Sequence, residues 1–280
     1  MSLDGKVAII TGAGGGFGRA FCSSILKAGA NVLALDINTK NLSIIEAESH
    51  KFGKSKLLTQ TVDIANFSAC EAAIEIGLNH FGQIDILINN AGLGMGSVRQ
   101  DHLIELVRID EITSGTWNRM IGVNLTGPWN MTKCCINNLR QSESARIINV
   151  TTSFFTMLRG KFQPYGPSKA GFEAMSASHA AEFSVDGITV NVVVPGGPAD
   201  TAMVPEGAGW NREQLVKPIT MTYPTLWLCS EEAKSITGNR YIASRWDPEK
   251  SIGRNRANTE TPIAWPNLAQ DPVWPGGKPS

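Results

Sequence analysis

The stretch VAIITGAGGGFG at residues 7–18 joins a short apolar run to a cluster of glycines. The run Val7–Ile10 is typical of a buried strand, and a helical pattern of apolar residues opens directly after the glycines. A tight turn from strand to helix requires a positive φ and the absence of Cβ atoms, and Gly12, Gly16 and Gly18 are the predicted positions. Such a turn aims backbone N–H groups and the helix dipole at a pyrophosphate, whereas the alternative is a loop that merely connects.

The order of strand followed by helix recurs along the chain, because short Val- and Ile-rich runs alternate with longer stretches of helical periodicity. The predicted strands are Val7–Ile10, Val32–Leu35, Leu57–Val62, Ile84–Ile88, Arg146–Val150, Thr189–Val194 and Tyr241–Ala243. The predicted helices are Phe17–Ala28, Asn41–Phe52, Phe67–Phe81, Trp117–Leu139 and Pro167–Phe183, several of them ending at Gly29, Gly53 or Gly82. Right-handed crossovers then predict an α/β protein with a three-layer Rossmann fold, a doubly wound parallel sheet of about seven strands.

The length of 280 residues and the hydrophobic content of 42% suit one large core, so we expect a single domain over residues 1–246. Two segments interrupt the alternation of strands and helices: residues 93–112 and the tail of residues 247–280. A substrate loop is expected near residues 196–217. Residues 247–280 contain Pro, Gly and Trp without periodicity and predict an irregular C-terminal extension. Its part from Trp265 to Trp274 is expected to wrap a neighbouring subunit, to close a pocket, or to fray.

The charges balance, with 25 basic and 25 acidic residues, so nothing in the overall charge favours binding to nucleic acid or to an anionic membrane. Nowhere do about 18 apolar residues follow one another, the length that a membrane-spanning helix needs. The five cysteines include no C-x-x-C pair and no His at metal-ligand spacing. We therefore expect a soluble cytoplasmic protein with reduced thiols and no bound metal.

The predicted second strand ends at Asp36, where a carboxylate can accept hydrogen bonds from the hydroxyls of an adenosine ribose. A 2′-phosphate at this place would face that carboxylate, and the next residue, Ile37, supplies no positive charge to compensate. The pattern favours NAD over NADP as the dinucleotide. The alternative is an ordinary surface Asp at the end of a strand.

Tyr165 and Lys169 lie four residues apart at the start of a predicted helix, so both side chains fall on one face. A phenol normally loses its proton near pH 10, and its use as a base at neutral pH requires a shift worth about 4 kcal/mol, which a nearby ammonium can supply in large part. The hydroxyls of Thr151–Ser153 follow the strand Arg146–Val150, at the sheet edge where a substrate is expected. A Tyr and a Lys four residues apart, or hydroxyl residues after a strand, are mostly structural by themselves. Only their combination with the glycine turn points specifically to a catalytic site.

Over the stretch from Leu3 to about Ala243 the chain resembles the short-chain dehydrogenase/reductase family. Thr11–Gly18 matches the family motif T-G-x-x-x-G-x-G, Asn89–Gly92 matches N-N-A-G, and Tyr165–Lys169 matches Y-x-x-x-K. These motifs also come in the family's order. The resemblance implies a Rossmann-type dehydrogenase domain with NAD as its cofactor.

The resemblance also implies a catalytic set. Tyr165 is expected to exchange a proton with the substrate oxygen, Lys169 to lower the pKa of that tyrosine and to bind the nicotinamide ribose, and Asn124 to hold the water of a proton relay. Where the family has its catalytic Ser, this chain has Thr152, with Ser153 beside it as a reserve. A Thr keeps the hydroxyl and adds a methyl group, which puts catalytic efficiency in doubt but not the reaction class.

For the cofactor, the resemblance implies that Asp63 contacts the adenine, that Asn90 steadies the central sheet, and that Pro195, Gly196 and Thr201 lie over the nicotinamide carboxamide. The further residues assigned to the cofactor site are Gly12, Gly14, Gly16, Phe17, Gly18, Asp36, Ile37, Ile64, Ala91, Gly92, Tyr165 and Lys169. The chain departs from the family pattern in the loops that usually set substrate specificity and assembly.

Together these features predict an NAD(H)-dependent oxidoreductase that interconverts a secondary alcohol and a ketone. The alternatives are a regulator that binds a dinucleotide without turnover, and a lyase or epimerase that uses bound NAD transiently. A moderately apolar small-molecule substrate is expected, with the pocket residues Ser153, Gly94, Met203 and Trp210. By resemblance the helices Trp117–Leu139 and Pro167–Phe183 would form a homodimer or homotetramer, unless their apolar faces only fill the core.

Overall fold

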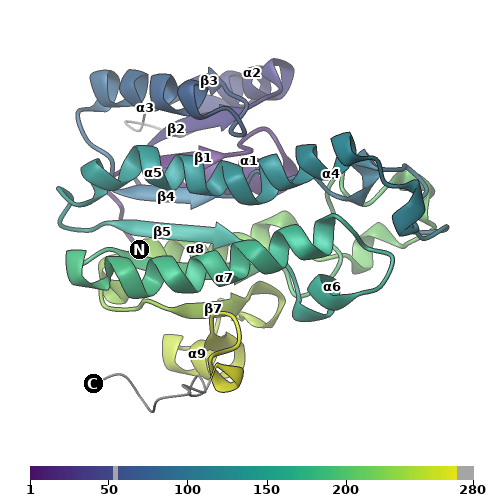
Figure 1. The fold of residues 1–280 in the computed structure, drawn as a ribbon. Coiled ribbons are helices and arrows are strands. Elements are labelled where there is room, and N and C mark those ends of the chain that lie inside the picture. Colours follow the sequence, from purple (N-terminus) through teal and green to yellow (C-terminus); the bar gives the residue numbers. More distant parts are fainter. Residues whose placement is uncertain (53–55, 270–280) are drawn as a thin grey trace, which may run out of the picture.

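The computed structural model describes residues 1–52 and 56–269, and it shows a sheet enclosed between two layers of helices (Figure 1). Within these residues eight strands form one sheet in the order β3-β2-β1-β4-β5-β6-β7-β8, and only the pair β7–β8 is antiparallel. The strands are β1 Val7–Thr11, β2 Asn31–Asp36, β3 Leu57–Thr61, β4 Ile86–Asn89, β5 Arg146–Val150, β6 Thr189–Val194, β7 Asn239–Ile242 and β8 Glu260–Pro262. The predicted doubly wound fold is confirmed, with an additional strand at one edge.

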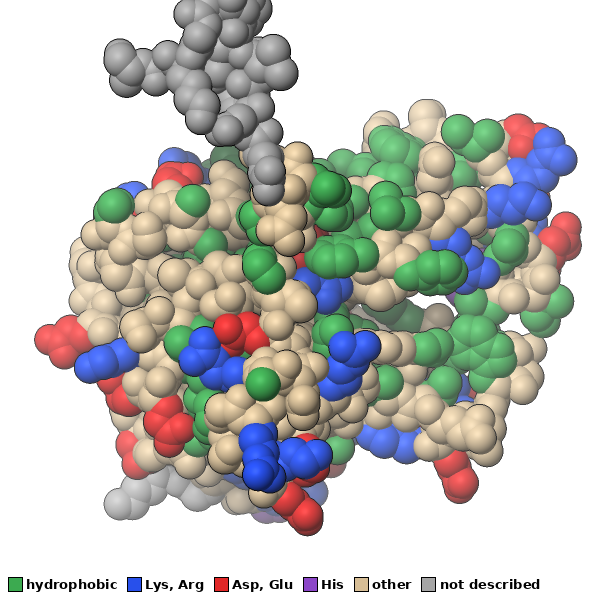
Figure 2. Space-filling view, turned by 90° about the horizontal axis from the view of Figure 1, so that it is seen from below, with side chains coloured by type: hydrophobic (Ala, Val, Ile, Leu, Met, Phe, Trp, Pro, Cys, Tyr) green, Lys and Arg blue, Asp and Glu red, His purple; other side chains and the backbone are tan. Residues whose placement is uncertain are grey.

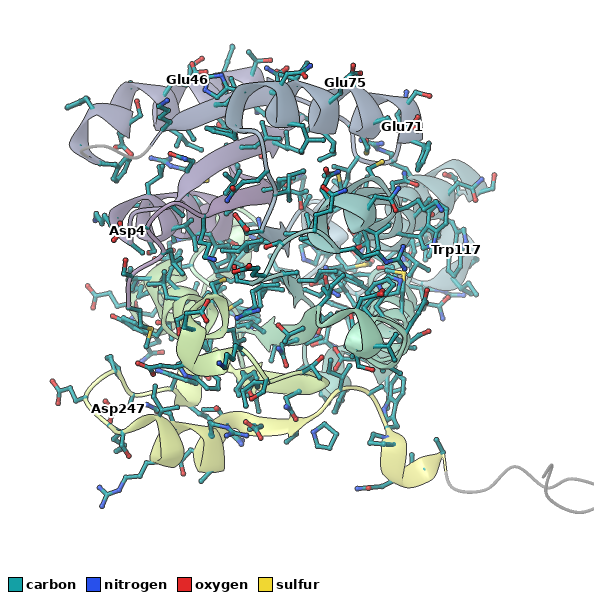
Figure 3. The ribbon with its side chains drawn as sticks, turned by 90° about the vertical axis from the view of Figure 1, so that its left-hand side faces the viewer. Asp4, Glu46, Glu71, Glu75, Trp117 and Asp247 are labelled. Atoms are coloured by element: carbon teal, nitrogen blue, oxygen red, sulfur yellow. The ribbon has the colours of Figure 1, made fainter. Side chains whose placement is uncertain are left out.

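Helices cover both faces of the sheet, which explains why its central strands are continuous apolar runs rather than alternating ones. The α-helices of the described residues are α1 Gly16–Lys27, α2 Thr39–Glu48, α3 Phe67–Phe81, α4 Ser114–Ile121, α5 Gly127–Leu139, α6 Phe154–Leu158, α7 Tyr165–Phe183, α8 Pro218–Cys229 and α9 Ile252–Thr259. Helices α1, α2 and α8 pack on one face, and α3, α5 and α7 on the other. Figure 1 shows α5 and α7 across the front of the sheet. Figure 3 shows the helices that carry Glu46 and Glu75 at one edge of the molecule and the segment that carries Asp247 at the other.

The helix expected over Trp117–Leu139 begins earlier, at Ser114, and it is interrupted by a π-helical turn at Gly122–Thr126. Such a turn inserts an extra residue into the helix and is frequent at functional sites. Asn124 lies within it and is fully buried. The periodicity of the sequence gave no sign of this insertion, because a single π turn hardly disturbs the spacing of apolar residues.

The prediction of an irregular C-terminal extension was wrong for residues 247–269. This segment forms α9 and then β8, whose strand pairs antiparallel with β7. Tyr241 of β7 donates a hydrogen bond to the Glu260 carboxylate at 2.7 Å, and Arg256 of α9 pairs with the same carboxylate at 2.6 Å. These tertiary partners make regular structure out of a short segment that carries too little periodicity to be recognised. The remainder of the expected tail, residues 270–280, lies outside the described residues.

Burial explains the state of the five cysteines, all of which have free thiols. It raises the pKa of Cys22 to about 12 and that of Cys134 to about 11, which makes both thiols poor nucleophiles. Among residues 1–52 and 56–269, no group of three or more His, Cys, Asp or Glu side chains could hold a metal ion. Over the same ranges no helix is both long enough and apolar enough to cross a membrane.

Candidate active site

A cleft of about 650 Å³ lies beyond the carboxyl ends of the central parallel strands, as expected for an open parallel sheet. Figure 2 shows the molecule hollowed on one side, with hydrophobic side chains around the opening. Most of the residues predicted for the cofactor and substrate sites line this cleft. Gly14, Gly18 and Asn124 are the exceptions, since they lie behind its surface.

The glycine turn between β1 and α1 forms one end of the cleft, and its glycines are required for different reasons. Gly12 has a φ of +63°, and a Cβ atom there would lie 2.7 Å from the Cα of Ala91. Gly16 and Gly18 do not have a positive φ, so that part of the prediction was wrong. A Cβ at Gly16 would instead lie 2.7 Å from the Thr201 side chain, and one at Gly18 would collide with the backbone of the turn. The absence of Cβ atoms thus lets the turn pack against Ala91, Thr201 and its own backbone, while Gly12, Gly15 and Gly16 line the cleft.

The Asn89–Gly92 segment after β4 holds this turn in place. The amide of Asn90 donates to the carbonyl oxygen of Thr11 at 2.9 Å and to that of Gly12 at 3.1 Å. In return the Thr11 hydroxyl accepts hydrogen bonds from the backbone N–H groups of Asn90 and Ala91, at 3.0 and 3.1 Å. The two central strands are therefore clamped together next to the glycines, which agrees with the sheet-steadying role expected of Asn90.

Asp36 lies at the end of β2, with its carboxylate facing the glycine turn. It accepts hydrogen bonds from the backbone N–H groups of Gly14 and Asn38, both at 2.8 Å. Ile37 beside it is 57% exposed and lines the cleft without a charge. Arg119, a basic residue of the cleft wall, forms an ion pair of 2.7 Å with Asp63. A 2′-phosphate in this corner would meet a carboxylate and no free cation of the described cleft wall.

Tyr165 begins α7 and faces the middle of the cleft. Burial raises the pKa of its phenol above the ordinary value, and a hydrogen bond with the Thr152 side chain lowers it in part. The expected lowering by Lys169 is not found: the side chain that acts on the phenol is that of Thr152. The phenol is therefore protonated at neutral pH in the structure.

Lys169 lies one helical turn further along α7 and is almost completely buried. Burial lowers the pKa of its ammonium to about 8, and the charge of Glu173 opposes that shift. Its Nζ donates a hydrogen bond to the carbonyl oxygen of Val150 at 3.0 Å, which fixes the side chain at the end of β5. The sequence correctly placed both residues on one helix face but could not show that the ammonium is anchored to the neighbouring strand.

The two hydroxyls after β5 have different partners. Ser153 is the N-cap of α6, because its oxygen accepts the backbone N–H of Thr156 at 3.1 Å. It also shares a hydrogen bond of 2.8 Å with the Thr156 hydroxyl. Thr152 is instead the side chain that interacts with the Tyr165 phenol. Because the Ser153 hydroxyl is used in capping α6, Thr152 is the better candidate for the hydroxyl that acts with the tyrosine.

Asn124, in the π-helical turn, is bonded to the segment that follows β4. Its amide donates to the Leu93 carbonyl at 2.9 Å and to the Ser168 hydroxyl at 3.0 Å, and its oxygen accepts the Leu93 N–H at 2.7 Å. Ser168 lies on α7 between Tyr165 and Lys169. Asn124 thus joins three elements behind the cleft.

The other end of the cleft is mostly apolar and has loop residues on its wall. Met203 contacts the position of Gly94, where an added Cβ would lie 3.3 Å from its side chain. Met203 and Trp210, both predicted for the pocket, line it and are partly exposed. Their loop is fastened by Asp200, which pairs with Arg212 at 2.7 Å and with Lys217 at 2.9 Å.

Sequence reasoning missed several residues of this region. Among them, His102, Arg159 and Phe162 line the cleft, and the charge of Glu173 acts on Lys169. The position of Glu173, one turn after Lys169, could have identified it. The others lie on irregular segments whose path the periodicity does not determine.

Comparisons with known proteins agree with this fold and indicate its family. A family model described as short chain dehydrogenase matches residues 6–211. The 3-oxoacyl-(acyl-carrier-protein) reductase FabG of Vibrio harveyi is 30% identical over 252 residues, covering 85% of this chain and 95% of the relative. The structure of a 3-ketoacyl-(acyl-carrier-protein) reductase from Brucella melitensis, complexed with NADH, is 27% identical with a TM-score of 0.73, over 86% of this chain and 97% of that one. Carveol dehydrogenase from Mycobacterium avium, in complex with NAD, shares the fold at 22% identity with a TM-score of 0.75, over 86% of this chain and 96% of that one.

Proposed function

The chain belongs to the short-chain dehydrogenase family of oxidoreductases, and on that premise we propose that it interconverts a secondary alcohol and a ketone with NAD(H). The observation that carries the proposal is that Thr152, Tyr165 and Lys169 line the same cleft as the glycine turn, with the Lys169 ammonium anchored on the Val150 carbonyl oxygen. A bound nicotinamide would supply or accept the hydride. The protein side chains would orient the substrate oxygen and move its proton.

Tyr165 is proposed as the proton donor in the direction of ketone reduction. Its burial keeps the phenol protonated at neutral pH, which is the state that a general acid needs. The Thr152 hydroxyl would donate a second hydrogen bond to the same substrate oxygen and hold it at the phenol. Positioned acid and base groups of this kind typically contribute about 10²–10⁴ in rate.

Lys169 is proposed to bind the nicotinamide ribose and to keep this part of the cleft positive. An ammonium has three hydrogens, and one of them is used for the Val150 carbonyl. Asn124 is proposed to support the return of protons from solvent, through water held near the π-helical turn. Its bonds to Leu93 and Ser168 would keep that turn fixed during the reaction.

NAD rather than NADP is proposed as the cofactor. Glycines of the turn line the cleft at the start of α1, and the Asp36 carboxylate is oriented by two backbone N–H groups beside the uncharged Ile37. This carboxylate would accept the ribose hydroxyls of NAD and repel a 2′-phosphate. The related Brucella protein was solved with NADH.

For the substrate, the relatives named for reduction of 3-oxoacyl groups suggest ketones placed near a carboxyl derivative. The apolar wall with Met203 and Trp210 suits a short hydrocarbon chain. The proposal is tested by following NADH absorbance with a panel of such ketones and the corresponding alcohols. Turnover with net oxidation of NADH is expected. A protein that binds NADH and turns over no member of the panel would be a sensor, and product formation without net redox change would indicate a lyase or epimerase.

A further inference from the structure

One cation on the cleft wall is left without a partner. Arg159 directly follows α6, is partly buried and lines the cleft. It forms no ion pair and no hydrogen bond with any residue of 1–52 or 56–269, whereas the other cations of the described wall are engaged: Arg119 by Asp63, and Lys169 by the Val150 carbonyl. Its guanidinium carbon lies 4.9 Å above the ring of Phe162. A cation held over an aromatic ring keeps its hydrogen-bond donors free for a ligand.

This guanidinium is close to the reacting centre. Phe162 lies between Arg159 and the catalytic tyrosine, because its ring packs edge-on against Tyr165 with 5.9 Å between the centroids. The neighbouring wall is formed by apolar side chains, among them Phe155 and Met203, and supplies no carboxylate to the guanidinium. An anionic group of the substrate would therefore find one matching charge at this end of the cleft, roughly one aromatic ring away from the phenol.

From this geometry we propose that the substrate carries a carboxylate near the reacting ketone or alcohol, and that Arg159 binds it. This inference rests on the proposed function and narrows its substrate to oxo acids and hydroxy acids. A guanidinium can hold a carboxylate through two parallel hydrogen bonds, which would fix the orientation of the carbonyl toward Tyr165 as well as the affinity.

The test compares 3-oxohexanoate with its uncharged ethyl ester, using the parent protein and Arg159→Met. The parent is expected to bind and reduce the acid better than the ester. In R159M the KM for the acid should rise about 10- to 100-fold and kcat for the acid should fall, because the charged group that binds and orients the acid is lost. The kcat and the KM for the ester should change little. Arg140→Met, which removes an arginine paired with Asp186 outside the cleft, is the matched control. An equal effect of R159M on acid and ester, or none on either, would refute the role of Arg159.

Binding is measured separately through the fluorescence of bound NADH. Tight binding of the acid that R159M weakens, without turnover, would contradict the proposed function and still support the anion site. Turnover of both compounds with equal KM would support the proposed function and overturn the anion site.

A second feature, independent of Arg159, is a buried ion pair beneath the catalytic residues. Glu173 lies on α7 one turn after Lys169, and its side chain is 0% exposed. Arg240 of β7, whose side chain is 3% exposed, approaches it with 3.1 Å between Nε and Oε1. Burying such a pair costs desolvation energy that its attraction often does not offset, so it is poor support for a purely stabilising role.

The remaining contacts of the pair lead to the catalytic strand end. The other oxygen of Glu173 accepts the Thr151 hydroxyl at 2.5 Å, and an Nη atom of Arg240 donates to the carbonyl oxygen of Thr152. Glu173 also accepts the backbone N–H of Ala264, which follows β8. The pair thus holds both residues that come directly after β5, and it faces Lys169 from below.

We infer that Glu173 and Arg240 are positioning residues, which hold the Thr152 hydroxyl against Tyr165 by fixing the backbone on which it stands. Neither Glu173 nor Arg240 lines the cleft, and Glu173 reaches the cofactor site only through the effect of its charge on Lys169. Their contribution should therefore appear in kcat and not in the affinity for NADH, since a displacement of a catalytic group by about 1 Å can reduce the rate by 10².

Arg240→Lys keeps the charge and loses the second donor arm, so we expect kcat to fall about 10- to 100-fold with an unchanged KM for NADH. In the parent the pKa of Lys169 is about 8, because burial lowers it and the charge of Glu173 opposes that effect. In Glu173→Gln this pKa should fall further. The limb of the pH profile that reports Lys169 should then move to lower pH. Glu260→Gln, which breaks a pair on β8 away from the site, is the control and should leave kcat and the profile unchanged.

If the single variants do not fold, the double variant Glu173→Gln with Arg240→Met removes both charges together and avoids an unpaired buried ion. It should bind NADH and show the same loss in kcat. A folded R240K or double variant with the kcat of the parent would overturn the inference, as would a parallel loss in NADH affinity, which would indicate a general structural role.

Discussion

Thr152→Val keeps the shape of the side chain and removes only its hydroxyl, so it isolates the chemical contribution of that group. In the structure this hydroxyl acts on the Tyr165 phenol and lowers its pKa against the effect of burial. Loss of one preorganised donor to an oxygen that gains negative charge costs about 10²–10³ in kcat. T152V should show a loss of this size, whereas Thr152→Ser should stay close to the parent.

A second consequence concerns pH. Burial raises the pKa of Tyr165 and Thr152 lowers it, so removal of the Thr152 hydroxyl should raise this pKa further. In ketone reduction, where the protonated phenol is the active form, the alkaline limb of the activity profile should therefore move to higher pH in T152V. In alcohol oxidation, where the phenolate is the active form, the limb on which activity rises with pH should move to higher pH. The profile of T152S should keep its position.

Ser153→Ala is the matched control, because it removes the hydroxyl of the adjacent residue. That hydroxyl caps α6 through the Thr156 N–H, so its loss should reduce the free energy of unfolding by about 1 kcal/mol. It should change kcat by no more than a few-fold. Steady-state kinetics with NADH and urea unfolding measure both effects. If S153A lost activity about a hundredfold and T152V did not, Ser153 would be the hydroxyl that acts with the tyrosine and our reasoning would be refuted.

Three further predictions concern the cofactor site and the C-terminal segment. Asp36→Ala should reduce the preference for NADH over NADPH about 10- to 100-fold, read from the ratio of the two kcat/KM values; an unchanged ratio would mean that Asp36 does not select the cofactor. Gly12 has a φ of +63°, and an added Cβ would collide with Ala91, so Gly12→Ala should destabilise the fold by about 1–3 kcal/mol and abolish NADH binding in a fluorescence titration. Gly15→Ala is the control: its Cβ would lie 3.4 Å from the nearest neighbour, and it should bind NADH normally. Burial raises the pKa of Glu260, but hydrogen bonds from Arg256 outweigh that effect, so the net pKa lies below its ordinary value of 4.5. The stability that this pair contributes is therefore present above pH 4.5 and is lost as the pH falls through the lowered pKa. The fall in Tm on acidification should be smaller in Glu260→Gln than in the parent, and an identical fall would contradict the assignment.

The fold and most of the cleft wall could be predicted because their signals are local. The strand, glycine turn and helix at residues 7–18 are adjacent in the chain, and parallel crossovers then place the residues after each strand at one edge of the sheet. Tyr165 and Thr152 meet for this reason, although they come from different elements. The same rule placed Asp36 and Asn90 beside the glycines.

What could not be predicted depends on contacts between distant segments. The strand β8 has too few residues for a periodic pattern, and it forms because the edge of β7 offers it backbone partners. Arg240 carries no local signal for its contact with Glu173. The anchoring of Lys169 on Val150 could not be predicted, because helical spacing fixes which face a side chain takes but not which backbone carbonyl its ammonium contacts.

The central claim is that the phenol of Tyr165 exchanges the proton while a bound dinucleotide exchanges the hydride. Tyr165→Phe removes one oxygen atom from the cleft, and its effect is measured as kcat on an accepted ketone together with the Kd of NADH. We predict a loss in kcat of about 10²–10⁴ with a nearly unchanged Kd. A variant that reduces the ketone as fast as the parent would contradict the claim.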